Sequence, residues 1–126
     1  ALPMRTGSMA PLIPAGSEIE ITGLRDAARL EVGDVVVFRR GERLVAHRLL
    51  FGWGLGERRW FVERGDGTSP AGRIRAGDVL GVVVAVRRPD GQHEDLTTAG
   101  ARRRGRAAVR RSLRRWLAGI VRGRGR

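Results

Sequence analysis

The stretch "GDVVVFRRGERLVAHRLLF", residues 33–51, decides the fold class of this chain. It begins with a Gly-Asp turn, continues as a run of β-branched residues and, after Gly41 and Glu42, resumes as a second apolar run. A continuous β-branched run is typical of a strand covered on both faces, and the intervening glycine turn favours a hairpin. In the second run, Val45, His47 and Leu49 should share one face of the strand. We therefore predict a β-hairpin whose first strand is buried.

Three further stretches on either side of this hairpin also have strand patterns: "SEIEITGL" at 17–24, "ERRWFVERG" at 57–65 and "GDVLGVVVAVRRP" at 77–89, where Pro89 ends the strand. No convincing helical pattern precedes residue 100. Short strands at regular spacing predict a mainly β body, either a small coiled all-β sheet or a partly open barrel.

The composition excludes several kinds of chemistry. The chain has 126 residues, enough for one domain, and all 25 basic residues are arginine, while cysteine and tyrosine are absent. Without cysteine there is no disulfide, thiolate nucleophile or cysteine-rich zinc site. His47 and His93 are the only histidines and lie far apart in the sequence, so we expect no metal site and no cofactor.

The net charge of +12 belongs almost entirely to the C-terminal tail. Residues 1–100 contain 14 arginines and all 13 acids, whereas residues 101–126 contain 11 arginines and no acid. We divide the chain accordingly into a β domain, 1–100, and an Arg-rich amphipathic helix and tail, 101–126. Large apolar residues on one face of this helix are Val109, Leu113, Trp116, Leu117 and Ile120.

Two interpretations of this helix remain open. Residues 106–121 could lie on an anionic membrane surface, or the apolar stripe could pack against the β domain. Nucleic acid is a less favoured partner, because no aromatic-studded β surface accompanies the arginines. The longest apolar stretches have about eight residues, well below the ~20 needed to span a bilayer, so we expect neither a transmembrane helix nor a secretory signal peptide. We expect a cytoplasmic or peripheral membrane location.

Candidate chemistry centres on a serine, a histidine and an aspartate. Ser8 lies in "TGSMAPLIPAG", residues 6–16, where Gly7 and Pro11 constrain the loop. Such a serine is either a turn residue or a nucleophile, and a nucleophile needs a nearby base. His47, in the middle of a strand, is either a core residue or that base. Asp66, between two glycines, either forms a hairpin turn or accepts a hydrogen bond from the imidazole.

Asp66 differs from the other two acids that follow a glycine. Asp34 and Asp78 each precede a run of valines and are interpreted as turn acids that start strands. Asp66 follows a strand and leads into a loop, so no such structural role is evident for it.

Together these stretches resemble a known family. "TGSMAPLIPAG", "GDVVVFRRGERLVAHRLL", "VERGDGTSPAG" and "DVLGVVVAV" occur in the order and approximate spacing seen in type I signal peptidase-like serine peptidases, which belong to the signal peptidase and SOS-repressor superfamily. The resemblance runs from about Thr6 to Val86. One branch of the family uses a Ser-Lys pair; the branch similar to archaeal and endoplasmic-reticulum signal peptidases has histidine in place of the lysine. This chain has no lysine, and His47 stands at the matching position.

The resemblance implies a β fold of the signal-peptidase type and a serine endopeptidase that acts through an acyl-enzyme. Ser8 would be the nucleophile, His47 the general base and Asp66 the supporting acid, with the Ser8 N–H and the Thr6 hydroxyl in the oxyanion hole. The substrate would be an extended leader- or signal-like peptide cut after small residues.

Two departures from the family pattern stand beside this resemblance. Many relatives carry an asparagine and a second aspartate shortly after the Gly-Asp motif; this chain offers neither before Asp78, so the identity of the acid stays open. Relatives also usually have a membrane anchor before the serine, and the seven residues before Ser8 are too few for one. Either an upstream anchor has been lost from this chain, or the protein is a soluble offshoot with another kind of substrate.

A second hypothesis belongs to a different class of function. In this hypothesis the chain is a catalytically silent, peptidase-like binding module, and its Arg-rich tail binds nucleic acid or an acidic partner. Steep salt dependence and indifference to Ser8 would distinguish it from the peptidase.

Overall fold

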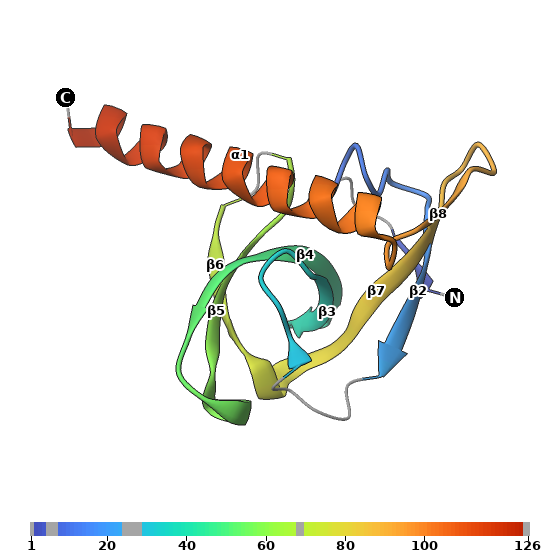
Figure 1. Ribbon diagram of the computed structural model, residues 1–126, viewed down its shortest axis with the longest axis horizontal. Coiled ribbons are helices and arrows are strands. Elements are labelled where there is room, and N and C mark those ends of the chain that lie inside the picture. The colour runs from blue at the N-terminus through green and yellow to red at the C-terminus, as the bar shows by residue number, and fades with distance from the viewer. Residues whose placement is uncertain (1, 5–7, 24–28, 68–69, 125–126) are drawn as a thin grey trace.

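The computed structural model describes residues 2–4, 8–23, 29–67 and 70–124. It contains one antiparallel sheet in the order β1-β2-β7-β3-β4-β5-β6, with β8 paired to β7. The strands are β1 (Leu2–Pro3), β2 (Glu18–Gly23), β3 (Val35–Arg40), β4 (Arg43–Trp53), β5 (Trp60–Arg64), β6 (Gly72–Arg75), β7 (Val79–Arg87) and β8 (His93–Asp95). The prediction of a mainly β fold with one C-terminal helix is confirmed (Figure 1).

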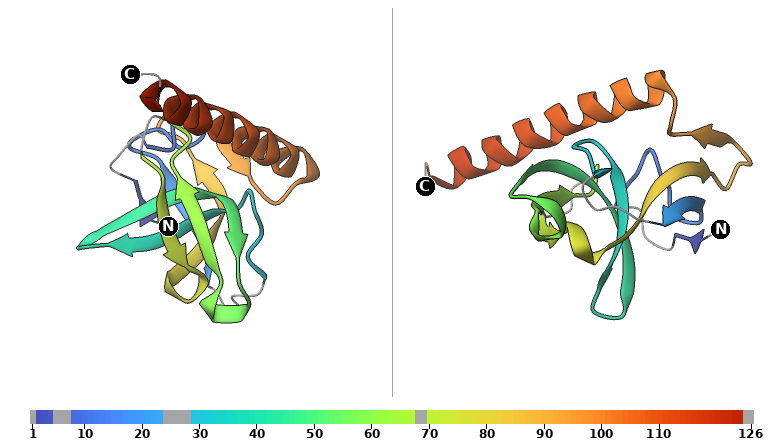
Figure 2. Two further views of the ribbon diagram at one scale, coloured as in Figure 1. Left: turned by 90° about the vertical axis from the view of Figure 1, so that its left-hand side faces the viewer. Right: turned by 60° about the horizontal axis from the view of Figure 1, so that its bottom comes forward.

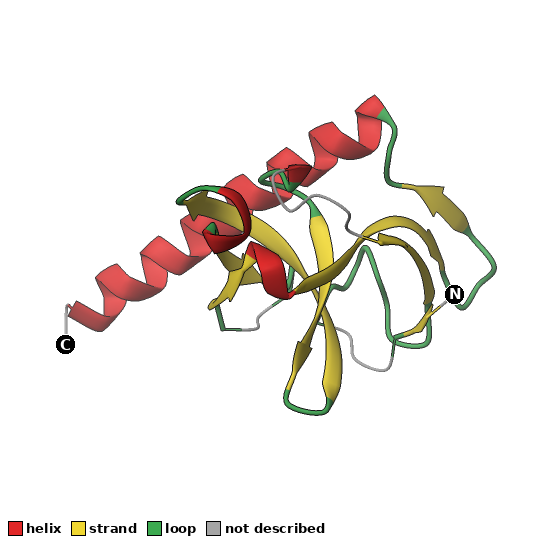
Figure 3. Ribbon diagram, turned by 90° about the horizontal axis from the view of Figure 1, so that it is seen from below, coloured by secondary structure: helices red, strands yellow, loops and turns green. Residues whose placement is uncertain are grey.

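The predicted hairpin forms the middle of this sheet. β3 pairs with β4 on one side and with β7 on the other, so its backbone is hydrogen-bonded along both edges. Alternate β3 residues enter two different core clusters: Val35 and Val37 pack with Ile19 and Val86, whereas Val36 and Phe38 enter the cluster on the opposite face. The expectation that this strand is covered on both faces is therefore confirmed. The tip of the hairpin projects from the body (Figures 2 and 3).

The sheet is strongly curved and is not closed into a barrel. The register of pairing shifts between Glu20 and Ile21 in β2, between Val37 and Phe38 in β3, and between Leu49 and Phe51 in β4. Such β-bulges bend a strand and increase its twist. Alternate residues of β4 and β5 face opposite sides: Leu49 and Phe61 enter the core inside the curved sheet, whereas Leu50 and Val62 pack with Val109 of the C-terminal helix.

Three strands were absent from the sequence-based prediction, because each has only two to four residues: β1, β6 and β8. The longer predicted strands all form, and β2, β5 and β7 are each shorter than the stretches that predicted them. Residues Gly56–Arg58 and Ala76–Asp78 form 3₁₀ turns (η2 and η3) immediately before β5 and β7. The interpretation of Asp34 as a turn acid is supported by its side chain, which accepts a hydrogen bond from the Glu31 N–H at 2.9 Å.

The C-terminal helix, α1, spans Ala99–Arg124 and lies across one end of the β body (Figures 1 and 2). Its first turn is capped by the Thr98 hydroxyl, which accepts a hydrogen bond from the Ala101 N–H at 3.1 Å. Val109 is buried against Leu50 and Val62, and the ring of Trp116 stacks on Phe51.

The first half of the helix lies close to the β body because small residues, which are not part of the predicted apolar stripe, face the sheet. Ala101, Gly105, Ala108 and Ser112 are buried or nearly so. A Cβ at Gly105 would lie 3.0 Å from Arg48 Nη1, so glycine permits the close approach of the helix. Arg64 of β5 donates to the Ser112 carbonyl at 2.9 Å.

The N-terminal part of the apolar stripe on α1 thus packs against the β body. Leu117 and Ile120, farther along the stripe, are exposed where α1 extends beyond the sheet. Binding of an anionic membrane by residues 106–121 stays a prediction. Within the described residues, no helix is both long and apolar enough to cross a bilayer.

Candidate active site

Ser8 is held by a loop whose neighbouring side chains are deeply buried. Met9 and Ile13 are 1% and 0% exposed, and the Ile13 N–H donates to the Met9 carbonyl at 2.9 Å, which closes a tight turn after the serine. The Gly67 N–H donates to the Ser8 carbonyl at 3.1 Å and ties this turn to the loop after β5. The serine therefore lies on a braced turn between β1 and β2.

His47 lies on β4 and directs its ring toward that turn. Its Nε2 lies 3.2 Å from Ser8 Oγ, although the two residues are 39 positions apart in the chain. The histidine is 4% exposed, and its ring packs edge-on against Phe38 at a centroid distance of 6.0 Å. Val45 and Leu49 pack in the same cluster as Phe38, so the predicted sharing of one face by Val45, His47 and Leu49 is confirmed. The stiff strand fixes the imidazole where the serine hydroxyl can donate to it.

The other ring nitrogen of His47 meets Glu63 of β5. Nδ1 lies 3.2 Å from Glu63 Oε2, and the opposite carboxylate oxygen, Oε1, accepts from Arg40 Nη2 at 3.0 Å. Glu63 is fully buried, and a Cβ at Gly72 of β6 would lie 2.5 Å from its Oε1. The carboxylate thus sits in a space bounded by a histidine, an arginine and a glycine backbone.

The pKa of Glu63 reflects two opposing effects. Burial on its own would raise the pKa of this carboxyl, but the hydrogen bonds and positive charges supplied by His47 and Arg40 hold the pKa below its usual value. Glu63 is therefore ionised at neutral pH. An anionic acceptor at Nδ1 favours the neutral tautomer whose proton is on Nδ1, which leaves the lone pair of Nε2 directed at Ser8 Oγ.

Asp66, the acid expected beside the histidine, lies elsewhere. Its two carboxylate oxygens accept from Arg48 Nε and Nη2, both at 2.8 Å. Neighbouring residues on a strand point to opposite faces, so Arg48 of β4 faces away from His47. The ion pair between Arg48 and Asp66 therefore lies on the opposite face of β4 from the imidazole. The expected hydrogen bond from His47 to Asp66 is thus replaced by one to Glu63.

Sequence reasoning missed Glu63, although a signal for it existed. In "WFVERG", Glu63 stands two residues after Phe61, so the two side chains share one face of β5. Phe61 is fully buried, and an acid on the buried face of a strand needs a partner. The pairing of Glu63 with Leu49 on β4 then brings it beside His47, two residues earlier on the same face of β4.

The remaining predicted site features stay predictions. Thr6, one of the two expected oxyanion donors, lies outside the described residues, and the role of the Ser8 N–H in that site is likewise an expectation. No group of three or more histidine and acidic side chains among the described residues is placed to hold a metal ion.

Comparisons with known proteins add no relatives. Scans against protein-family models, curated proteins and solved structures found no match to this chain. The resemblance to signal peptidase-like serine peptidases therefore rests on the sequence motifs alone.

Proposed function

We propose that this protein is a serine endopeptidase in which Ser8 is the nucleophile and His47 the general base. The observation that supports this proposal best is the continuous line of contacts from Ser8 Oγ through the His47 imidazole to Glu63, with 3.2 Å at each step. A serine hydroxyl becomes an effective nucleophile when a positioned base takes its proton and a third group orients that base.

Each residue has a defined part in the proposed reaction. Ser8 Oγ attacks the carbonyl carbon of the scissile bond as its proton passes to His47 Nε2, and the imidazolium then gives that proton to the leaving amine. Water then attacks the carbonyl carbon of the acyl-enzyme as His47 Nε2 takes its proton. The imidazolium returns that proton to Ser8 Oγ as the acyl group leaves as a carboxylic acid. Glu63 stabilises the imidazolium, and Arg40 fixes Glu63 in its orientation. The Ser8 N–H and the Thr6 hydroxyl are the proposed donors to the oxyanion, and this part rests on the family resemblance.

The proposed substrates are leader- or signal-like peptides that bind in extended conformation and are cut after small residues. This substrate class also follows from the resemblance. Extended peptides commonly add to the edge of a sheet, where main-chain hydrogen bonds supply affinity.

The test is cleavage of a diverse peptide library, with the products mapped by mass spectrometry. The wild-type protein is compared with Ser8→Ala and with Ser17→Ala as a matched control. Ser17 is buried, and its Oγ has no hydrogen-bond partner among the described residues, so its loss should leave both fold and activity intact. We expect cleavage by wild type and Ser17→Ala and none by Ser8→Ala. Cleavage that persists in a folded Ser8→Ala protein would overturn the proposal.

The silent binding module remains the competing hypothesis. It predicts that none of the three proteins cuts any peptide, with or without anionic vesicles, and that binding to nucleic acid or an acidic partner is the same in wild type and Ser8→Ala.

A further inference from the structure

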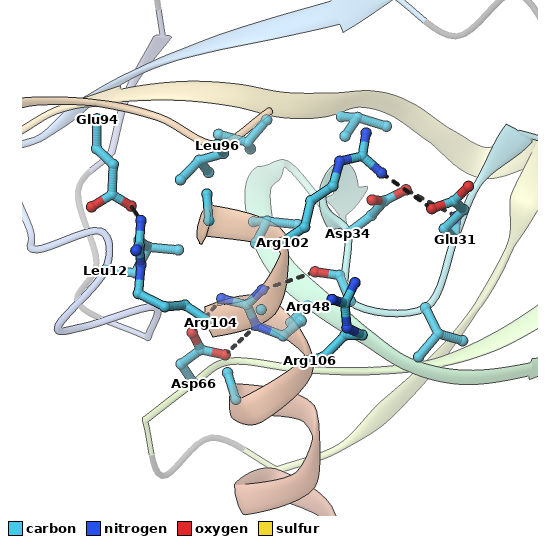
Figure 4. Close-up of a pocket in the computed structure, with 18 of the residues that line it drawn as sticks. Leu12, Glu31, Asp34, Arg48, Asp66, Glu94, Leu96, Arg102, Arg104 and Arg106 are labelled. Atoms are coloured by element: carbon cyan, nitrogen blue, oxygen red, sulfur yellow. Dashed lines mark hydrogen bonds and ion pairs between the residues drawn. The ribbon is translucent and has the colours of Figure 1, made fainter. Parts of the chain in front are cut away.

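A large cavity lies between α1 and the β body, on the face of β4 opposite to His47. Its volume is about 1050 Å³, and it is lined by residues of α1, β7, the start of β3 and the loop that carries Ser8 (Figure 4). This volume is at the upper end of the range for small-molecule sites, roughly 300 to 1000 Å³, and so has room for several residues of a peptide.

The lining of this cavity is strongly basic. Among the residues that the structure describes, eight arginines and four acidic residues contribute to it. Three of these acids pair with arginines of the lining: Asp66 with Arg48, Glu31 with Arg102, and Glu94 with both Arg88 and, at 3.9 Å, Arg104. Figure 4 shows the pairs of Arg48 with Asp66 and of Arg102 with Glu31. The acids of the lining are thus largely engaged in internal ion pairs, and Arg106, Arg111 and Arg115 add positive charge to the cavity beyond these pairs.

The surplus is concentrated on α1. Arg106, Arg111 and Arg115 line the cavity, are exposed, and make no hydrogen bond or ion pair within the described part of the chain. Arg111 and Arg115, four residues apart, lie side by side on α1, whereas Arg106 lines the cavity from a different side of the helix. Because none of the three pairs with an acid among the described residues, together they offer the cavity a binding surface for carboxylates.

The cavity adjoins the Ser8 loop. Ala10 and Pro11, which follow the serine by two and three residues, are part of its wall, as is Gly67, whose N–H bonds the Ser8 carbonyl. A polypeptide that binds across the Ser8 turn can therefore continue into the cavity.

We propose that this cavity binds an acidic polypeptide segment through Arg106, Arg111 and Arg115. Describing that segment as part of the substrate rests on the proposed peptidase function; the binding itself does not. The substrates would then carry several Asp or Glu residues near the small residue at the cut, which narrows the substrate class.

The chemistry of the wall favours a polypeptide over a nucleic acid. None of the described residues that line the cavity is aromatic, and proteins that bind single-stranded nucleic acid typically stack bases on aromatic rings. Aliphatic side chains line it instead, among them Leu12, Val32 and Leu96, which suit the aliphatic portions of a peptide.

The test uses two triple variants of equal charge in the full-length Ser8→Ala protein, so that binding is measured without cleavage. The first replaces Arg106, Arg111 and Arg115 with glutamine. The matched control replaces Arg103, Arg110 and Arg114, which are exposed on the same helix but do not line the cavity. The probes are a fluorescein-labelled twelve-residue Ala-Glu peptide, its Ala-Gln counterpart and a labelled oligo(dT), followed by fluorescence anisotropy; thermal unfolding verifies that both variants fold.

We expect the Ala-Glu peptide to bind, the Ala-Gln peptide to bind far more weakly, and the cavity variant to lose about tenfold in affinity, about twofold for each exposed ion pair removed. The control variant should stay within about twofold of its parent. Equal losses in both variants, or no binding of the Ala-Glu peptide, would overturn the proposal. Tighter, cavity-dependent binding of oligo(dT) would overturn it in favour of nucleic acid.

The same design separates this inference from the proposed function. Cavity-dependent binding of the Ala-Glu peptide, together with no cleavage of any peptide by wild type, would support the acidic-peptide site and count against the peptidase. Cleavage by wild type with no selective binding of the Ala-Glu peptide would support the peptidase and overturn the cavity proposal.

Discussion

Exchanging each of two acids for its amide tests which acid serves His47. Glu63→Gln keeps the size of the side chain but removes the negative charge 3.2 Å from His47 Nδ1. Asp66→Asn makes the corresponding change at the acid that the sequence motif favours, which in the structure is paired with Arg48. Glu63→Gln should mainly lower kcat/KM, and Asp66→Asn should mainly lower the free energy of unfolding.

The size of the Glu63 effect follows from the geometry. When His47 takes the serine proton, the imidazolium and the Glu63 carboxylate become a pair of unit charges 3.2 Å apart, an attraction of about 5 kcal/mol at an effective dielectric constant of about 20. Glutamine forfeits this attraction and no longer favours the tautomer with its proton on Nδ1. We therefore expect kcat/KM to fall about 10³- to 10⁴-fold in Glu63→Gln.

Asp66→Asn should weaken the fold more than the reaction. The Arg48 and Asp66 side chains are only 6% and 11% exposed, so the variant leaves a nearly buried guanidinium without its charged partner. We expect a loss of about 2 to 4 kcal/mol in the free energy of unfolding and less than a tenfold change in kcat/KM.

Two assays decide between these outcomes. The first is the kinetics of cleavage of a library-derived peptide, with stability measured by denaturant unfolding. The second needs no substrate: nitrogen-15 NMR of the two imidazoles reports the His47 tautomer, with the exposed His93 as an internal reference. Glu63→Gln should reduce the population with the proton on Nδ1. If Asp66→Asn abolishes cleavage in a folded protein while Glu63→Gln leaves both cleavage and tautomer unchanged, the assignment of Glu63 is wrong.

Two further predictions concern the surroundings of Glu63. Because the pKa of Glu63 is lower in the folded protein than its usual value of 4.5, its ionised form contributes stability that is present above about pH 4.5 and is lost as the pH falls through the lowered pKa. The free energy of unfolding of wild type should therefore drop more steeply below pH 4.5 than that of Glu63→Gln, and parallel curves would contradict this. Gly72→Ala should displace the carboxylate, since the added Cβ would lie 2.5 Å from Glu63 Oε1; we expect kcat/KM to fall about tenfold and stability by about 1 to 3 kcal/mol. The control is Gly23→Ala, where no described residue other than the two chain neighbours comes within 4 Å of the added Cβ, and an equal loss in both variants would refute the steric argument.

In the first half of α1, the apolar pattern predicts the helix but not how the helix packs. Its periodicity was sufficient to predict a helix, because helical spacing of apolar residues is a local property of the chain. Its packing depends on Gly105 and Ala108, small residues whose value appears only when another backbone or side chain comes close. The choice between packing on the β body and remaining exposed therefore needed the three-dimensional arrangement.

The sequence by itself determined the mainly β body, the central hairpin and the candidate pair Ser8 and His47, because strand patterns, turn residues and motif order are all encoded locally. Only the tertiary structure decided which acid meets the imidazole. His47 and Arg48 are adjacent on β4 and face opposite sides of the sheet, and the pairing of β4 with β5 shifts register between Leu49 and Phe51. Strand register and facing depend on contacts between distant segments, and these contacts place Glu63 at His47 and Asp66 at Arg48.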